Sequence, residues 1–146
     1  GTEGRSKYVA WAGDVPAGFL NVWAEVGSVH SAGKRLLYIE HVAAAPGNMA
    51  AEVWGKRFEA VGSALFAFTA LLSWQKGHEG RIGLHAADES ALEFYRRLDV
   101  KCGGRMLYPE VKGIVGPTPR GEHERGKTYL ETREEGARAW LEKYRG

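Results

Sequence analysis

The residues with the clearest chemical potential lie in a turn between an apolar strand candidate and an apolar helix candidate. Residues 36–44 (LLYIEHVAA) suit a central strand, and a helix is predicted to begin near Val61. Between them, Arg57 precedes the small residues Gly62 and Ser63. Because the first four N–H groups of a helix lack internal partners, such a turn can bind an anion such as a phosphate. The alternative is an ordinary strand-to-helix connection in which the small residues serve close packing.

Two motifs in this part of the chain resemble signatures of the GNAT superfamily of N-acetyltransferases. Residues 42–46 (VAAAP) and 57–65 (RFEAVGSAL) resemble its coenzyme A motif, hydrophobic-Ala-hydrophobic-x-Pro, a spacer, then Arg/Gln-x-x-Gly-x-Gly/Ala. Residues 88–98 (DESALEFYRRL) resemble its second signature, Asn-x-x-Ala-x-x-Phe-Tyr-x-x-Leu. The two motifs occur in the family's order and span residues 36–104 with their flanking elements. Residues 45–48 (APGN) partly match a bacterial subgroup that has Ala-Pro-Trp-Asn before a long spacer.

The resemblance implies acetyl-coenzyme A as the co-substrate. The amides of residues 57–63 would hold the pyrophosphate, whose charge a helix dipole favours by up to about 2 kcal/mol. Residues 42–44 would offer backbone groups to the pantetheine arm, as a sheet edge does to a peptide, and one amide there would stabilise the thioester oxyanion. The implied cofactor-binding residues are Val42, Ala43, Ala44, Arg57, Phe58, Ala60, Val61, Gly62, Ser63, Asp88 and Tyr95.

Acetyl transfer to an amine needs a base that removes a proton from the ammonium and an acid that protonates the leaving thiolate. Tyr95 matches the position of the family's usual tyrosine acid, and its alternative is a core tyrosine with a satisfied hydroxyl. Glu40 is the candidate base, because a carboxylate inside an apolar strand is costly unless it is paired or functional. Strand alternation places Glu40 on one face with Tyr38 and Val42. The alternative for Glu40 is a salt bridge to an arginine across the sheet.

The other reactive side chains indicate no further site. His41 projects to the face opposite Glu40 and is expected to be structural. His78 and His85 have no ligand spacing with an acid or a cysteine, so no metal site is predicted. Cys102, the only cysteine, has no adjacent base and is expected to be a small core residue.

Three departures from the family pattern bear on function. Ala60 replaces the first glycine of the turn, the spacer from Pro46 to Arg57 is longer than usual, and the chain begins at what would be the second strand. The acceptor, a small-molecule amine or a peptide, is therefore not identified, and a homodimer or a fused or partner domain would complete its site. A non-catalytic acyl-CoA-binding module acting through a partner chain is the second hypothesis.

Periodicity and turn residues predict the elements that must position these side chains. Strands are expected at 7–11, 19–26, 36–44, 81–86, 105–111 and 128–131. Helices are expected at 61–74, 90–98 and 132–145, with Asp88 or Ser90 capping the second and Thr132 the third. Residues 113–127, rich in Gly, Pro and charge, are predicted to form a mobile loop. This order indicates an α/β (α+β) fold, a GNAT-like mixed and mostly antiparallel sheet flanked by helices and shortened at the N-terminus.

Composition limits the class of protein. The 146 residues, 44% hydrophobic and 26% charged, fit a single domain over 1–146. A formal charge of +2 is too small to indicate nucleic acid binding, and acidic residues interleave with basic ones in the C-terminal third. No segment has the roughly 18 apolar residues of a membrane span, and the start does not resemble a signal peptide. A single cysteine excludes an intramolecular disulfide, and a cytoplasmic location is expected.

Overall fold

The computed structural model describes residues 4–12, 14–44, 51–119 and 121–145. These residues form an α+β fold, as expected, with a five-stranded sheet and four helices. The strands are β1 (Arg5–Ala12), β2 (Val15–Gly27), β3 (Arg35–Ala44), β4 (Ile82–His85) and β5 (Tyr129–Glu131). The helices are α1 (Ala51–Gln75), α2 (Glu89–Lys101), α3 (Gly121–Glu124) and α4 (Glu134–Arg145).

The sheet is open and mixed, and its strands follow the chain order from β1 to β5. Antiparallel pairing joins β1 to β2, β2 to β3 and β4 to β5, whereas β3 and β4 are parallel. The crossover between the parallel strands is α1, because parallel neighbours need a long connection. The strand expected at 105–111 is reduced to two isolated bridges, from Leu107 to Thr132 and from Val111 to Tyr129.

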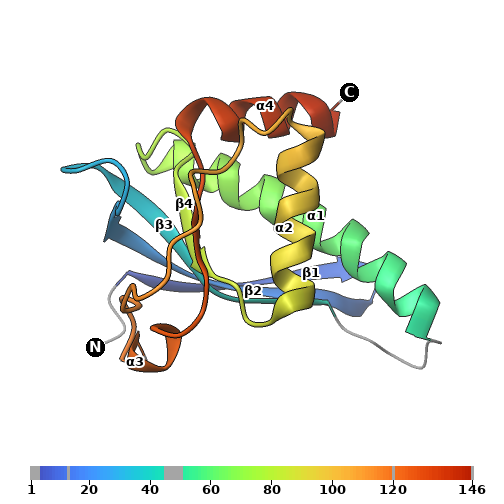
Figure 1. Cartoon of the computed structure of the whole chain (residues 1–146). Helices are drawn as coiled ribbons and strands as arrows, with labels where there is room; N and C mark the ends of the chain where they lie inside the picture. The colour runs from blue at the N-terminus through green and yellow to red at the C-terminus, as the bar shows by residue number, and fades with distance from the viewer. Residues whose placement is uncertain (1–3, 13, 45–50, 120, 146) are drawn as a thin grey trace.

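The three long helices, α1, α2 and α4, cover one face of the sheet (Figure 1). Their apolar side chains, among them Phe66, Leu98 and Trp140, join Leu20 and Leu37 of the sheet in the main core. Helix α2, which carries Tyr95, is therefore held on the sheet by the apolar contacts of the main core.

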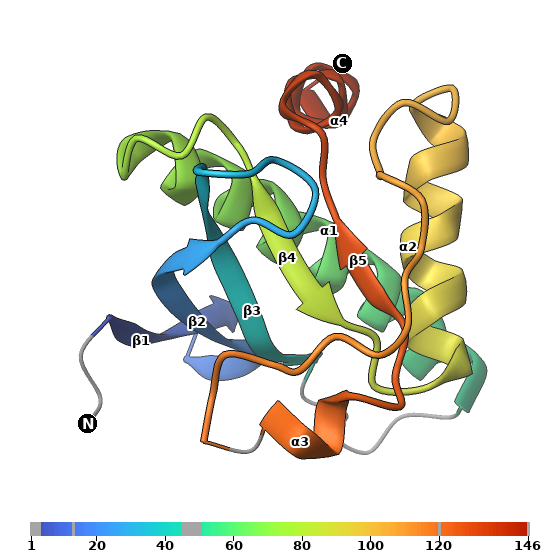
Figure 2. The same cartoon turned by 60° about the vertical axis from the view of Figure 1, so that its left-hand side comes forward.

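The segment 109–127, which contains α3, runs across the opposite face (Figure 2). Leu36, Tyr38 and Tyr129 are buried there, and Ile114 of the segment packs against them. This smaller apolar cluster lies between segment 109–127 and the first half of β3.

Part of this segment, residues 113–127, was expected to be a mobile loop. It has its own backbone hydrogen bonds, from Gly113 N to Arg125 O at 3.1 Å and from Gly116 N to Gly121 O at 3.1 Å. A Cβ at Gly121 would overlap the carbonyl group of Gly116, so only glycine permits this close approach. The segment is thus folded back on itself more tightly than its composition suggested.

Helix α1 begins at Ala51, so the predicted start near Val61 is wrong. Residues 51–60 show no clear hydrophobic period, but they are mostly strong helix formers such as Ala, Glu, Lys and Arg. Once a helix is nucleated, each added residue costs little, so propensity extends α1 over a stretch where periodicity gave no signal.

The two predicted helix caps have different outcomes. Asp88 does cap α2, because its Oδ1 accepts a hydrogen bond from Ala91 N at 2.9 Å. Thr132 does not cap α4, which begins at Glu134. The Thr132 hydroxyl instead accepts from Ile82 N at 2.9 Å and donates to the Gly80 carbonyl at 3.1 Å. It satisfies backbone groups where β4 begins.

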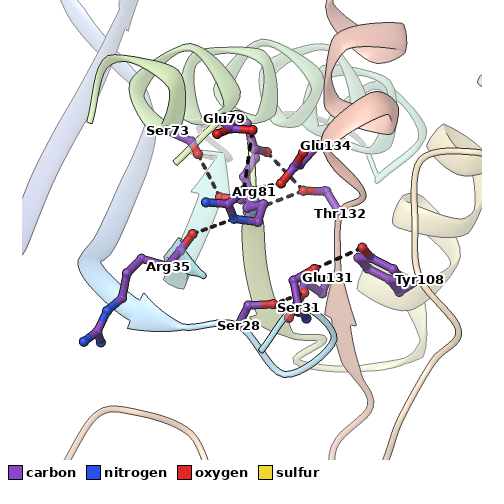
Figure 3. Close-up of polar contacts among 12 residues, drawn as sticks. Ser28, Ser31, Arg35, Ser73, Glu79, Arg81, Tyr108, Glu131, Thr132 and Glu134 are labelled. Carbon is purple, nitrogen blue, oxygen red and sulfur yellow. Dashed lines mark hydrogen bonds and ion pairs between the residues drawn. The ribbon is translucent and has the colours of Figure 1, made fainter. Parts of the chain in front are cut away.

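A buried arginine fastens the parallel strand pair at its amino end (Figure 3). Arg81, 3% exposed, donates from Nε to the Arg35 carbonyl at 2.8 Å and forms an ion pair with Glu134 of α4. Its own carbonyl accepts from Ser73 Oγ at 2.9 Å. Through its side chain and its carbonyl, Arg81 therefore joins the starts of β3 and β4 to α1 and α4.

A second buried polar group holds the β2–β3 hairpin against β5 (Figure 3). The Glu131 carboxylate, 1% exposed, accepts from Ser28 Oγ at 2.5 Å, from Val29 N at 2.9 Å and from Tyr129 Oη at 2.7 Å. These three donors compensate for the desolvation of the carboxylate. These contacts connect the β2–β3 loop to β5.

Candidate functional site

The parallel strands β3 and β4 diverge toward their carboxyl ends. Their pairing covers residues 37–39 of β3 and 82–84 of β4. β4 then ends at His85, whereas β3 continues to Ala44 and is paired on its β2 side. Beyond Ile39, the backbone edge of β3 that faces away from β2 has no strand partner among the described residues. In sheets with parallel strands, ligand sites characteristically lie at such carboxyl ends.

A β-bulge lies where the two strands separate. Asn21 of β2 is paired with His41, but the next residue, Val22, is paired with Ile39, so Glu40 is the extra residue on β3. Bulges bend a strand and redirect its side chains, and they are frequent next to active sites.

The bulge corrects the expected order of side chains along β3. Tyr38 belongs to the cluster beneath segment 109–127, whereas Val42 packs against the helix-covered core. The prediction that Tyr38, Glu40 and Val42 share one face is therefore wrong, because the inserted residue shifts the alternation by one position.

A cavity of about 100 Å³ lies at the point of divergence. Its walls come from the end of β3, from β4 with the two residues after it, and from α2. The lining residues are Ile39, Glu40, His41, Val42, Leu84, His85, Ala86, Ala87, Ala91, Phe94 and Tyr95. The structure thus brings together Glu40, Val42 and Tyr95, which the sequence analysis had singled out. The cavity is far smaller than a typical pocket for a whole ligand, so it suits a thin chain or a small group.

Tyr95 lies in this wall with an ordered ring and a protonated hydroxyl. The ring is 4% exposed and contacts Phe66 and Phe94 at centroid distances of 5.6 Å and 5.0 Å. Burial raises the pKa of the Tyr95 hydroxyl well above its usual range. Within the described residues the hydroxyl has no hydrogen-bond partner, so it is available as a donor to a bound group.

Glu40 forms the salt bridge that the sequence analysis had kept as the alternative to a base. Its Oε1 accepts from Arg5 Nη2 at 2.9 Å, and its Oε2 accepts from Trp23 Nε1 at 2.7 Å. Arg5 also lies over the Trp23 ring at 5.9 Å. Both carboxylate oxygens are engaged by neighbouring strands, so Glu40 is bound in place and is not poised as a free base.

His85, which the sequence analysis set aside, lies at the end of β4 in the cavity wall. Its Nδ1 lies 2.7 Å from Tyr38 Oη, and its Nε2 lies 2.7 Å from the Ile114 carbonyl oxygen. Burial lowers the pKa of His85 below its usual value, although the Ile114 carbonyl and Glu124 act in the opposite direction. No sequence signal could identify this cluster, because its members come from β3, β4 and segment 109–127.

The residues expected to bind the pyrophosphate lie inside α1. Arg57, Phe58, Ala60, Val61, Gly62 and Ser63 follow the first turn of a helix that begins at Ala51. Helical N–H groups there donate to carbonyls four residues earlier, so they are not the free donors that the sequence analysis required. The side chains of Arg57 and Phe58 lie outside the described part of the structure.

Gly62 has a packing role instead. It is buried, and a Cβ at this position would lie 3.1 Å from Cζ of Phe94 in α2. The glycine allows α1 and α2 to approach closely, which supports the close-packing alternative for the small residues of this stretch. Ala60, by contrast, is exposed beside β1.

The remaining predicted residues lie around the cavity or in the core. Ala43 and Ala44 continue β3 beyond the bulge, paired with Phe19 and Gly18 of β2. Cys102 is buried in the main core, as expected. The structure shows no group of three or more His, Cys, Asp or Glu side chains arranged for a metal ion among the residues it describes.

A scan against models of protein families and a search of curated proteins found no match to this chain. The resemblance to the GNAT superfamily therefore rests on the two motifs. In the described part of the chain, every helix is too short or too polar to serve as a membrane span.

Proposed function

We propose that the chain is an acetyl-CoA-dependent N-acetyltransferase of the GNAT type, acting on a primary amine of a small molecule or a peptide. The main support is that a parallel strand pair opens around a narrow cavity whose wall includes Tyr95 of the second motif. The first motif supplies the β3 side of the same opening through Val42. Two motifs noted in the sequence for one ligand thus border one cavity.

The pantetheine arm is the part of coenzyme A that suits this opening. It is a thin chain with two amide groups, and the unpaired edge of β3 offers N–H and C=O groups to such a chain, as in β-strand addition. The small cavity would then enclose the thioester next to Tyr95.

The pyrophosphate needs a different location from the one inferred from the sequence. The N–H groups without internal helical partners belong to residues 51–54, the first turn of α1. We assign the pyrophosphate to this turn, where the free amides and the helix dipole both favour an anion.

In the proposed reaction, the neutral amine attacks the carbonyl carbon of the thioester. A carbon–nitrogen bond forms, the carbonyl oxygen becomes an oxyanion, and an edge amide of β3 stabilises it. The carbon–sulfur bond then breaks, and Tyr95 donates its hydroxyl proton to the departing thiolate. The nitrogen of the new amide loses its extra proton, which restores the Tyr95 hydroxyl. The amine must first lose a proton as an ammonium ion, so the site also needs a proton acceptor.

The engagement of Glu40 favours a second candidate function. Glu40 is the only carboxylate that the described residues contribute to the cavity wall, and Arg5 and Trp23 occupy both of its oxygens. The expected base is therefore not free. A module that holds acyl-CoA without catalysis and acts through a partner chain would need no base. In either case, a homodimer or a fused or partner domain would complete the acceptor side.

Release of free thiol from acetyl-CoA in the presence of a panel of amines separates the two functions. An enzyme should release thiol only when a suitable amine is present, and Tyr95→Phe should lower the rate while binding of coenzyme A is retained. Tight binding without turnover on any amine would favour the module. If millimolar coenzyme A fails to raise the melting temperature, both functions are refuted, because even a weak site stabilises a protein by mass action.

A further inference from the structure

The first strand of the sheet, β1, has an open backbone edge. Among the described residues β1 is paired only with β2, and it forms one side of the sheet (Figure 2). Ala24 N of β2 donates to the Gly4 carbonyl at 2.7 Å, directly before the first paired residue of β1. Because bonded and non-bonded positions alternate along an antiparallel pair, the N–H and C=O groups of Lys7, Val9 and Trp11 point away from β2. These groups are available to a further strand.

Apolar side chains flank this edge on the sheet face that the helices leave uncovered. Tyr8 and Ala10 pack against the main core, so alternation places Val9 and Trp11 on the opposite face. Trp11 is 62% exposed and Val9 is 43% exposed. Phe19 of β2 is paired with Val9 and is exposed beside it. Three large apolar side chains therefore lie together in solvent at the edge of the sheet.

A groove of about 590 Å³ lies on the helix side of the same edge, between β1 and α1. The Tyr8 ring lies in its wall and meets the Phe68 ring of α1 at a centroid distance of 5.0 Å. Four exposed apolar residues of α1 have the spacing of one helix face, and they are Ala60, Ala64, Phe68 and Leu71. Both sides of the β1 edge are thus apolar and exposed.

The edge lacks the features that usually protect an exposed strand. Natural proteins block such edges with proline, charge or a bulge. Residues 5–12 (RSKYVAWA) contain no proline, and the register shift in the β1–β2 pair adds Ala17 to β2 and leaves β1 regular. Of the two cations of β1, Arg5 is already paired with Glu40, and Lys7 lies in the first half of the strand. The second half, which ends near Trp11, is unprotected, so a partner is expected to cover it.

We propose that β1 pairs with β1 of a second copy of this chain, antiparallel about a two-fold axis at Val9. Such a contact is isologous, so one edge supplies both sides of it, and α1 of both copies lies on the same face of the joined sheet. An axis at Lys7 would oppose two ammonium groups, which is destabilising. An axis at Tyr8 would set each ammonium against Val9. An axis at Val9 instead places Lys7 opposite Trp11 of the second copy, where the ammonium meets an aromatic ring.

The exposed apolar area is in the range that a stable dimer needs. A standard interface buries about 800 Å² on each partner. A large side chain presents about 150–250 Å², so the exposed parts of five side chains supply on the order of 400 Å² of this, namely Val9, Trp11, Phe19, Phe68 and Leu71. The alanines of the groove and the open backbone of β1 add to it. The contact is independent of the proposed acetyl transfer, because β2 separates β1 from the cavity wall.

Analytical ultracentrifugation of the whole chain tests the dimer. At high micromolar concentration the wild type should sediment at twice its mass of 16.0 kDa. Val9→Pro removes an outward N–H, and an edge strand tolerates proline there, so this variant should stay folded by circular dichroism but sediment as a monomer. Val9→Lys should do the same. Val29→Lys is the matched control, because Val29 is also 43% exposed but lies in the β2–β3 loop, and it should remain a dimer. A monomeric wild type, or folded Val9 variants that remain dimers, would overturn the proposal.

Disulfide cross-linking tests the position of the axis. The two copies of residue 9 would form a hydrogen-bonded pair with Cα atoms about 5.5 Å apart, which a disulfide can span. Val9→Cys should therefore give a covalent dimer on oxidation, whereas Val29→Cys should not; the native Cys102 is buried. Absence of cross-linking at Val9, or equal cross-linking of both variants, would contradict the proposed contact. A wild-type monomer that binds an added peptide strand along β1 would show that the edge serves a different partner, and would overturn the proposal as well.

Discussion

At Gly136, α4 packs closely against the backbone of residues 105–106, and replacing this glycine with alanine tests that packing. The residue is buried in α4. A Cβ at this position would lie 2.5 Å from the Met106 carbonyl oxygen and 2.6 Å from the Arg105 carbonyl oxygen. Both atoms belong to the backbone, so no side-chain rotation can relieve the overlap.

Two effects of opposite sign decide the result of Gly136→Ala. In an exposed helix interior, the change would stabilise the protein by about 1 kcal/mol through helix propensity. Overpacking a tight contact typically costs about 1–3 kcal/mol. The cost should lie at the upper end here, since α4 would have to move away and loosen Trp140 and Leu141 in the core. We therefore expect a net loss of about 1–2 kcal/mol.

Urea unfolding followed by circular dichroism measures this difference, and the melting temperature should fall by about 3–8 °C. Arg138→Ala is the matched control, because Arg138 is exposed on the same helix and its replacement should change stability by less than about 0.5 kcal/mol. A variant Gly136→Ala that is more stable than the wild type would refute the close approach of α4 to residues 105–106.

Three further predictions concern the cavity, the buried histidines and segment 109–127. Tyr95→Phe should lower acetyl transfer by about 10²-fold or more in a thiol-release assay, while urea unfolding shows less than about 1 kcal/mol of change. Burial lowers the pKa values of His85 and His78 in the folded protein. As the pH falls, the unfolded chain therefore takes up protons at a higher pH than the folded protein does. The free energy of unfolding should fall as pH drops below about 6.5, less steeply in His85→Gln. Gly121→Ala should destabilise by about 1–3 kcal/mol in urea, because its Cβ would overlap Gly116.

The fold was predictable from the sequence where local patterns and tertiary contacts agree. Alternation along β2, the apolar run of β3, the apolar stripe of α2 and the cap at Asp88 were each visible as residue patterns. The start of α1 was not visible, because residues 51–60 adopt a helix through propensity without a hydrophobic period. Thr132 had the right type for a cap, but its hydroxyl bonds to the neighbouring strand.

The site was predictable only in part. Tyr95 and Val42 were found from the motifs, and both line the cavity. The bulge at Glu40 depends on a register shift against β2, which one strand's sequence does not reveal. Similarly, Tyr38 and His85 are 47 positions apart in the chain, so their contact exists only in the folded sheet.

The parallel strand pair also divides β3 into two regions of unequal local stability. At one end, Leu37 N donates to the Arg81 carbonyl, and Arg81 is itself buried and hydrogen-bonded to Arg35. Amides in such a place exchange with solvent only when a large part of the fold opens. Beyond the bulge at Glu40, the outer edge of β3 has no such constraint from β4. Amides on that outer edge of β3 should therefore exchange with solvent sooner than the amide of Leu37.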